Sequence, residues 1–452
     1  MLGCACVAQE SQVALSPPVP ITPAFFGMHI NRRGEPWPLP TIPFGAYRTI
    51  DSWGTLWSVV ERSPGVYNWT WLDPRLADAE LKGVDVLYTI YSIPAFYSSN
   101  PRDASCSNAV GACYPPDDLN PDGSGTDQHL KNFMTALVNH VGNKIAYYEM
   151  WNEANIPSEW KGTWAQLVRM SQDMRSTILA VNPNAKLLSP SFVELTYNTA
   201  AIKAALYLQT SVNGSTGSDA ADIINFHGYV VTPSIPVALA ENEVVNVNNL
   251  RAALSDVDLV KPLWDTEWGN SGAISDVDLV VAFTARHLLI QATQGIARTY
   301  YFDWDPSNTR ALWSNVIANC LGVGSPNAGG HLCANGTTYA QVESWLLGAT
   351  STVPCSGPLP PATGVWTCAF TRPDIAQMFA VWDTSQTCSN RNCTTSTYSY
   401  DSRYTEFLSL ENENSNALSG GTVSIGVKPI ILLCRTRQVG APTGLKGVVN
   451  HH

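Results

Sequence analysis

Between residues 24 and 350, short apolar runs rich in β-branched and aromatic residues alternate with longer amphipathic stretches. The short runs favour strands and the longer stretches favour helices. Such alternation predicts an α/β protein with a parallel sheet covered by helices, and eight strands are the number that closes a (β/α)8 TIM barrel. We expect the eight strands at residues 24–30, 45–50, 85–91, 144–152, 185–190, 222–227, 261–266 and 297–303.

Helices are expected between these strands. Thr163 and Gln166 have the spacing of a capping box, and Asn182-Pro183 ends the helix that follows. A doubly wound open sheet is the alternative arrangement, but no Gly-x-Gly-x-x-Gly follows an early strand, which favours the barrel. The clearest helical stretches are residues 71–82, 127–141, 163–181, 277–293 and 338–349.

The pattern changes after residue 350, where Gly, Pro, Thr and Ser dominate and the helical periodicity ends. Short alternating runs there predict a small C-terminal antiparallel β-sandwich. We therefore expect an N-terminal segment (1–20) in which residues 12–19 offer one more strand to the sandwich, a catalytic barrel (21–350), the sandwich (351–440) and a tail ending in a tag-like His pair (441–452). The sandwich strands are expected at residues 364–371, 377–382, 394–400, 422–425 and 429–434.

Composition narrows the class of partner. Only 14% of the residues are charged, whereas the chain has 15 Trp and 17 Tyr. Surfaces rich in aromatic rings and poor in charge suit neutral, flat-faced ligands such as sugars, although aromatic residues also fill large cores. The net charge of −11 argues against a nucleic-acid partner. No apolar run reaches the roughly 18 residues that a membrane helix needs, so we expect no membrane span.

The 11 cysteines indicate an oxidising compartment, and hence a secreted or periplasmic protein. Eight of them form four close pairs in loop-like sequence, which we interpret as disulfides rather than free thiols. None has the repeated C-x-x-C spacing of a zinc site, so no metal is expected. The first ten residues resemble the end of a secretion signal. The expected pairs are Cys106/Cys113, Cys320/Cys333, Cys355/Cys368 and Cys388/Cys393.

Two carboxylates stand where a hydrophobic strand meets its loop: Glu153 after the fourth expected strand and Glu267 after the seventh. Carboxylates are rare in such settings unless they are paired or used in chemistry. In a TIM barrel the active site lies at the carboxyl ends of the strands, and glycosidic bond cleavage needs one proton donor and one nucleophile or base. The other strand-end candidates, for substrate binding, are His29, Arg48, Asp51, Asn152, His227, Tyr229 and Trp304.

These motifs resemble a known group of enzymes. Trp151-Asn152-Glu153, with a Glu ending the seventh strand, is similar to the signature of clan A retaining glycoside hydrolases. Further segments resemble glycoside hydrolase family 39, and their order looks most like the short bacterial exopolysaccharide-type members. The likeness spans about residues 24–350, and it departs from the commoner Asn-Glu-Pro in having Ala154. The segments are Phe26-Gly27-Met28-His29, Arg48-Thr49-Ile50-Asp51, Gly65-Val66-Tyr67-Asn68-Trp69 and Phe226-His227-Gly228-Tyr229.

The resemblance implies roles for the candidates. Glu153 would be the general acid/base, and Glu267 the nucleophile that forms a glycosyl-enzyme. Arg48 and Tyr229 would lie beside Glu267, and Asn152 would hold the sugar's 2-hydroxyl group. Trp304 would form an aromatic floor. His227 would orient Glu153 or Tyr229, or contact a hydroxyl group. His29 and Asp51 would contact the substrate.

Several residues have a structural alternative. Glu149 lies inside the strand that precedes Glu153, and a buried salt bridge with an arginine of the barrel interior explains it better than catalysis. His29 is either a subsite contact or a satisfied core imidazole. Asp265 stands two residues before Glu267, and we expect it to be structural.

The leading hypothesis is thus a retaining glycosidase that acts on β-linkages of a poly- or oligosaccharide. One alternative is an exo-acting, β-xylosidase-like enzyme. Another is a non-catalytic carbohydrate-binding protein on a degenerate barrel, which would usually have lost one of the two carboxylates. The chemistry needs no metal and no organic cofactor, and the resemblance to the short exopolysaccharide-type members implies a monomer.

Overall fold

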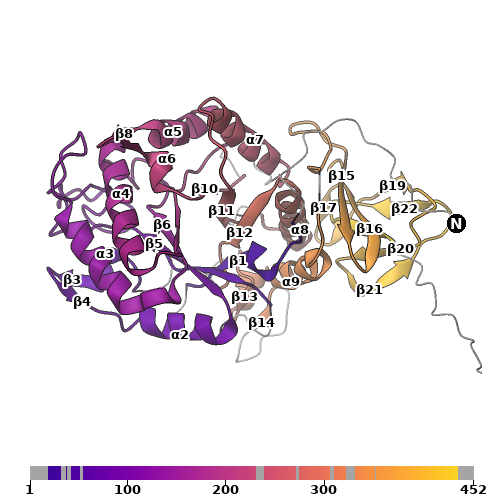
Figure 1. Ribbon diagram of the computed structural model, residues 1–452. Coiled ribbons are helices and arrows are strands. Elements are labelled where there is room, and N and C mark those ends of the chain that lie inside the picture. The colour runs from indigo at the N-terminus through magenta and orange to yellow at the C-terminus, as the bar shows by residue number, and fades with distance from the viewer. Residues whose placement is uncertain are drawn as a thin grey trace, which may run out of the picture.

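The computed structural model describes residues 19–31, 37, 42–50, 54–230, 239–270, 274–305, 310–321, 331–351 and 353–435. Eight parallel strands form one sheet: β1 (Phe26–His29), β2 (Ala46–Arg48), β5 (Asp85–Ile90), β6 (Tyr147–Met150), β7 (Lys186–Leu188), β10 (Ile224–His227), β11 (Leu263–Trp268) and β12 (Ile296–Tyr301). A parallel bridge between Leu188 and Ile223 joins its two edges, and the sheet closes into a barrel (Figure 1). The predicted TIM barrel is confirmed.

Helices surround the barrel in Figure 1: α2 (Leu72–Lys82), α3 (Gln128–Val141), α4 (Trp164–Val181), α5 (Asn198–Gln209), α7 (Asn242–Ser255), α8 (Val277–Thr293) and α9 (Ala334–Leu346). The capping box is present, because Gln166 N donates to Thr163 Oγ1 at 3.1 Å and Thr163 N donates to Gln166 Oε1 at 2.9 Å. The sequence analysis did not single out α5 or α7. The sequence did not reveal α7 because its buried face carries Asn242, Glu243 and Asn246 and therefore shows no clean apolar stripe.

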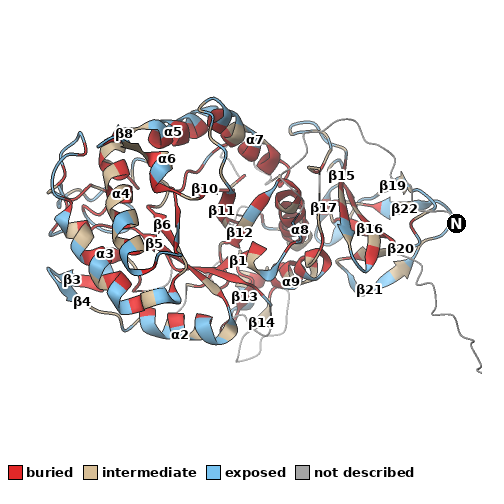
Figure 2. Cartoon of the chain, in the orientation of Figure 1, coloured by how far each residue is buried: buried red, intermediate tan, exposed pale blue. Residues whose placement is uncertain are grey.

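The barrel interior is built in layers. The lower layer is apolar and consists of side chains from six places around the barrel wall: Ala46, Leu87, Leu188, Ile223, Trp264 and Tyr300. Gly27 is required here, because a Cβ on this residue would lie 2.5 Å from the Tyr300 ring. The next layer, two residues further along several strands, is polar and fully buried (Figure 2), and it supports the functional site.

The C-terminal strands form an antiparallel sheet in the order β15 (Val365–Arg372), β16 (Ile375–Asp383), β23 (Ile430–Cys434), β20 (Glu406–Ser409) and β21 (Asn412–Ala417). A ribbon of β19 (Ser396–Ser399) and β22 (Thr422–Ile425) packs against it, as predicted for a β-sandwich. The sequence analysis missed β20 and β21, and the polar sequence of β21 explains why it shows no strand pattern. The expected domain boundaries stay a prediction. The expected strand at 12–19, apart from Val19, and the tail at 441–452 lie outside the described residues.

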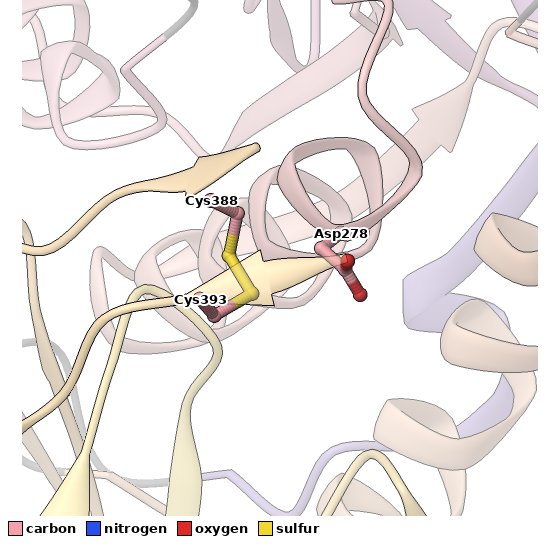
Figure 3. A group of neighbouring side chains, drawn as sticks. All are labelled: Asp278, Cys388 and Cys393. Atoms are coloured by element: carbon pink, nitrogen blue, oxygen red, sulfur yellow. A yellow bond between two sulfur atoms is a disulfide. The ribbon is translucent and has the colours of Figure 1, made fainter. Parts of the chain in front are cut away.

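The sandwich is fastened to the barrel by specific contacts. Trp382 Nε1 donates to Glu241 Oε1 at 2.8 Å, and Arg286 Nη1 lies 3.3 Å from the same oxygen. The short hairpin of β17 (Cys388–Ser389) and β18 (Asn392–Cys393) lies beside Asp278 at the start of α8 (Figure 3). Its Asn390 backbone N–H donates to Asp276 Oδ2 at 2.9 Å.

All four predicted disulfides are present: Cys106–Cys113, Cys320–Cys333, Cys355–Cys368 and Cys388–Cys393. Cys355 is joined to Cys368 of β15 by a disulfide, and its backbone N donates to Thr293 Oγ1 of α8 at 2.9 Å. These two contacts fix the start of the sandwich against α8. Among the helices that the structure describes, none has the length and apolar character needed to cross a membrane.

Replacing Trp382 by Phe keeps an aromatic ring but removes the N–H that Glu241 accepts. We expect the free energy of unfolding to fall by about 1–2 kcal/mol, because a buried carboxylate loses a donor. Urea denaturation at pH 7 measures the change. In a Glu241→Gln background the same substitution should cost less, and equal costs in both backgrounds would contradict a role for this bond.

Candidate active site

The site rests on a buried ion pair in the polar layer of the barrel. Arg48 Nε donates to Glu149 Oε2 at 2.7 Å and Arg48 Nη2 donates to Glu149 Oε1 at 2.8 Å, with both side chains fully buried. Thr89 Oγ1 and Asn225 Nδ2 donate to the same carboxylate at 2.6 and 2.5 Å. A buried charge is tolerated when it is paired and fully hydrogen-bonded, as here. The salt bridge expected for Glu149 is confirmed.

Arg48 also reaches the two strand-end segments that the sequence singled out. Its Nη1 donates to Glu267 Oε2 at 2.8 Å, and its Nη2 donates to Asn152 Oδ1 at 2.9 Å. The second oxygen of Glu267, Oε1, accepts from the Tyr229 hydroxyl at 2.8 Å. These donors stabilise negative charge on Glu267. Burial and the Glu267 charge raise the pKa of Tyr229 well above its usual value, so its hydroxyl stays protonated as a donor.

Glu153 faces Glu267 from the loop after β6. An oxygen of Glu153, an oxygen of Glu267 and a ring nitrogen of His227 all lie within 4.8 Å of one another. The backbone turns sharply here, with φ of +76° at Trp151 and +44° at Glu153, a region that costs non-glycine residues about 1 kcal/mol. Trp151 anchors the turn, because its Nε1 donates to the Glu159 carbonyl at 2.9 Å and its ring packs against Trp160.

His227 lies against Glu153, with Nδ1 at 2.9 Å from Oε1. Burial, together with the nearby Arg48 and His29, lowers the pKa of His227 to about 4, although Glu267 and Glu149 act in the opposite direction. The imidazole is therefore neutral near pH 7. A neutral Nδ1 can donate to an ionised Glu153 in one tautomer and accept from a protonated Glu153 in the other.

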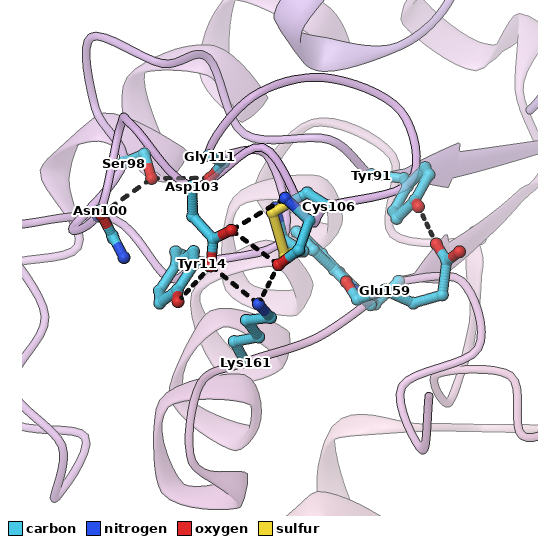
Figure 4. Close-up of a disulfide and its surroundings, with 12 residues drawn as sticks. Tyr91, Ser98, Asn100, Asp103, Cys106, Gly111, Tyr114, Glu159 and Lys161 are labelled. Carbon is cyan, nitrogen blue, oxygen red and sulfur yellow. Dashed lines mark hydrogen bonds and ion pairs between the residues drawn. A yellow bond between two sulfur atoms is a disulfide. The ribbon is translucent and has the colours of Figure 1, made fainter. Parts of the chain in front are cut away.

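The loop that carries Glu153 is clamped by the loop after β5 (Figure 4). The disulfide Cys106–Cys113 constrains the clamping loop, and Lys161 N donates to the Cys113 carbonyl at 2.8 Å. Lys161 Nζ donates to Asp103 Oδ2 at 2.7 Å. Hydrogen bonds from Lys161 and Ser105 hold the pKa of Asp103 below its usual value. The Lys161 end of the Glu153 loop is thus fixed to the disulfide-constrained loop after β5.

The structure brings together six of the nine predicted site residues: Arg48, Asn152, Glu153, His227, Tyr229 and Glu267. His29 is fully buried, and its Nε2 lies 2.8 Å from the Thr266 carbonyl, which is the geometry of a core imidazole. Trp304 is 1% exposed and stacks on Trp313. Substrate contacts of these two residues stay predictions, and Asp51 lies outside the described residues.

The sequence analysis missed the residues that support the site from below and beside. Asn225 and Thr89 complete the shell of Glu149, and Ser191 Oγ accepts from Glu153 N at 2.9 Å. One signal was available, because Asn225 is a polar residue between the apolar Ile224 and Phe226 of β10. A polar cluster at the ends of β1 and β12 was also missed: Asn31, Asp303, Asp305 and Arg310.

Four groups in the described part of the chain bring possible metal ligands together. In one, Cys388 and Cys393 are joined as a disulfide and do not ligate (Figure 3). The second group is Glu153, His227 and Glu267, and there Arg48 already supplies a positive charge to Glu267. The remaining groups are Asp117, Asp118 and His129, of which only Asp117 is exposed, and the fully buried Glu243, Asp265 and His287.

Comparison with known proteins places the fold. No protein-family model and no curated protein matches the sequence. Among solved structures, a family 39 glycoside hydrolase from Bacteroides cellulosilyticus matches with a TM-score of 0.60 at 15% identity, over 91% of this chain and 81% of that chain. The chain shares the fold of glycoside hydrolases.

Two further structures extend this similarity. A family 39 β-xylosidase from Caulobacter crescentus matches with a TM-score of 0.57 at 15% identity, over 94% of this chain and all of that chain (100%). A family 30 endoxylanase from Clostridium papyrosolvens matches with a TM-score of 0.56 at 13% identity, over 93% of this chain and 98% of that chain. The structural neighbours thus include members of the family that the sequence motifs resemble.

Removing the positive charge of Arg48 tests how far the site depends on it. Arg48→Met leaves Glu149 buried without a cationic partner, which should lower the free energy of unfolding by about 3–5 kcal/mol. Arg48→Met/Glu149→Gln removes both charges and should recover most of that loss. Urea denaturation of both variants measures the difference, and a double variant no more stable than the single one would be inconsistent with this pairing.

The depressed pKa of His227 predicts a pH-dependent stability. A histidine with a lowered folded-state pKa contributes stability that is present above its ordinary value of 6.5 and is lost as the pH falls towards about 4. The advantage of the wild type over His227→Asn should therefore shrink between pH 6.5 and pH 4, by at most about 1.4 kcal/mol per pH unit. Urea unfolding across that range measures it. A constant difference would show that the imidazole titrates normally.

Proposed function

We propose that this protein is a retaining glycoside hydrolase that cleaves β-glycosidic bonds of a poly- or oligosaccharide by double displacement. The observation that carries the proposal is the approach of the Glu153 and Glu267 carboxylate oxygens to within 4.8 Å. Retaining enzymes place their carboxyl groups about 5–5.5 Å apart, whereas inverting enzymes leave about 6.5–9.5 Å for a water molecule. The gap here suits one anomeric carbon.

In the first step, Glu267 attacks the anomeric carbon and the bond to the leaving oxygen breaks. Glu153 donates its proton to that oxygen, so that an alcohol departs and a glycosyl ester of Glu267 remains. Arg48 and Tyr229 hold the two oxygens of Glu267 and aim the carboxylate. Glu153 is left ionised, and the neutral His227 at 2.9 Å then donates to it.

In the second step, Glu153 takes a proton from water as the water oxygen attacks the anomeric carbon. The ester bond breaks, and Glu267 recovers its charge beside Arg48. Asn152 serves both steps: its Oδ1 is engaged by Arg48, which leaves the amide N–H groups to bind the sugar's 2-hydroxyl group. That hydrogen bond strengthens as positive charge develops on the sugar.

The proposal also covers the compartment, the oligomeric state and the choice between exo- and endo-action. The four disulfides support a secreted or periplasmic enzyme, and we infer a monomer. A non-catalytic binding protein is disfavoured, because both carboxylates are kept together with their donors. The structural neighbours include a β-xylosidase and an endoxylanase, and an exo-acting, β-xylosidase-like activity is the alternative to an endo-acting one.

The decisive experiment is azide rescue. On an activated aryl β-glycoside, Glu267→Ala should lose about 10⁴-fold or more in kcat, and azide should restore turnover with a glycosyl azide of inverted configuration. Glu153→Ala should keep its first step with a good leaving group, and azide should give the retained product. Undiminished activity of Glu267→Ala would contradict the assignment of the nucleophile.

A product profile on plant and bacterial polysaccharides separates the two modes of action. Release of single sugars from chain ends would support the exo-acting alternative, whereas early formation of mixed oligosaccharides would support internal cleavage. Glu267→Ala is the matched control, because it should release neither.

A further inference from the structure

A fully buried carboxylate, Asp265, lies directly behind Glu267 on β11. Its Oδ1 accepts from two backbone N–H groups, that of Gly228 at 2.9 Å and that of Glu267 itself at 3.2 Å. Both amides lie where the strand ladders are irregular. The β10–β11 register shifts between Phe226 and His227, and the β11–β12 register shifts between Asp265 and Trp268. The Gly228 N–H also donates to the Glu267 carbonyl at 3.0 Å, so it is shared between that carbonyl and Asp265 Oδ1.

The other oxygen of Asp265 belongs to a network between the barrel wall and two helices. Gln291 of α8 directs its Nε2 to Asp265 Oδ2, to Glu243 Oε1 at 3.3 Å and to His287 Nε2 at 2.7 Å. All of these side chains are fully buried. Glu243 of α7 also accepts from Asn246 Nδ2 at 2.9 Å. Gln291 Nε2 thus lies between three possible acceptors, which belong to Asp265, Glu243 and His287.

The hydrogen bonds of this network depend on which carboxyl group carries a proton. An amide NH2 group has two hydrogens, so three acceptors around it require one further proton. Burial raises the pKa of Glu243 to about 8, and burial together with the Glu243 charge raises the pKa of Asp265 well above its usual value, so the pair holds one proton near pH 7. Asp265 accepts from two backbone N–H groups, whereas Glu243 accepts from the Asn246 side chain, which favours Asp265 as the ionised member. Burial lowers the pKa of His287 to about 3, so His287 is neutral and its Nε2 accepts. The two hydrogens of Gln291 therefore go to His287 and Asp265.

Gly228 shows how tightly Asp265 is fitted. A Cβ on Gly228 would lie 2.2 Å from Asp265 Oδ2, so only glycine allows this approach. Gly228 immediately precedes Tyr229, the residue that donates to Glu267 Oε1. The Asp265 carboxylate therefore ties together the backbone of Glu267 and the backbone of its donor.

We propose that Asp265 is a positioning residue for the nucleophile, held in its working orientation by the Gln291 amide. The inference rests on the proposed function, in which Glu267 attacks the substrate. Asp265 touches no substrate and acts through the backbone of Glu267 and Gly228. Its effect should appear in the chemical step, because a small displacement of the nucleophile weakens the transition state more than substrate binding.

An exchange of donor and acceptor tests this arrangement. Asp265→Asn turns one oxygen into an NH2 group, which must face either Gln291 or the two backbone amides, donor against donor. We expect kcat to fall about ten- to hundred-fold, with KM changed less than about two-fold. Asp265→Asn/Gln291→Glu exchanges the two roles, restores the donor–acceptor match, and should recover most of kcat.

Glu343→Gln is the matched control. Glu343 is a buried carboxyl group of α9 that has no hydrogen-bond partner among the described residues, and burial raises its pKa to about 8. The same carboxyl-to-amide change there should leave kcat at the wild-type value. All variants are compared well below their melting temperatures, so that loss of folded protein does not enter the rates.

Hydrogen exchange of the Gly228 and Glu267 amides gives a second measurement that needs no substrate. Exchange should be faster in Asp265→Asn and should slow again in the double variant. Wild-type kcat and exchange in Asp265→Asn would overturn the inference, as would a double variant no better than the single one, or a stoichiometric metal ion bound at Asp265 in the wild type. Inactive wild type with the expected exchange pattern would instead count against the proposed function.

Discussion

The buried guanidinium of Arg48 is the interaction on which the site depends. It binds three acceptors from two strands: Glu149 within β6, Asn152 just after β6, and Glu267 near the end of β11. Arginine suits this task because its planar fork presents five N–H donors in fixed directions and stays charged when buried. Two of these acceptors are carboxylates, so the layer is stable only while the positive charge remains between them. The position of the nucleophile is thus set by the core of the barrel.

Around that centre the protein separates apolar and polar layers. The apolar layer of Leu87, Trp264, Tyr300 and their neighbours fills the lower barrel and supplies the packing that holds the strands in register. The polar layer above it exchanges hydrogen bonds instead of filling space. This order places charged groups close to the open end of the barrel, where the Glu267 and Glu153 side chains are 13% and 20% exposed. Arg48, the partner of Glu267, and His227, the partner of Glu153, are fully enclosed. A dry environment of this kind strengthens the electrostatic interactions on which acid–base chemistry relies.

The two carboxylates are held by different means. Glu267 is fixed by side-chain donors in front and by the Asp265 carboxylate behind its backbone. Glu153 stands on a strained turn that neighbouring elements hold in place, among them Trp151 and the disulfide-constrained loop after β5. A nucleophile profits from rigidity, whereas an acid/base that alternates between two protonation states needs a partner such as His227 that accepts either.

The sequence by itself determined the barrel, the sandwich, the four disulfides and the pair of strand-end glutamates. All of these follow from local patterns, namely strand and helix periodicity, close cysteine spacing and polar residues at strand ends. Only the tertiary structure decided that Arg48 serves both Glu149 and Glu267, which are 101 and 219 residues away along the chain. It also placed His29 Nε2 at 2.8 Å from the Thr266 carbonyl and gave the buried face of α7 its polar partners. Periodicity reports which face of an element is buried, but hydrogen bonds between distant segments depend on how the closed barrel brings strand ends together.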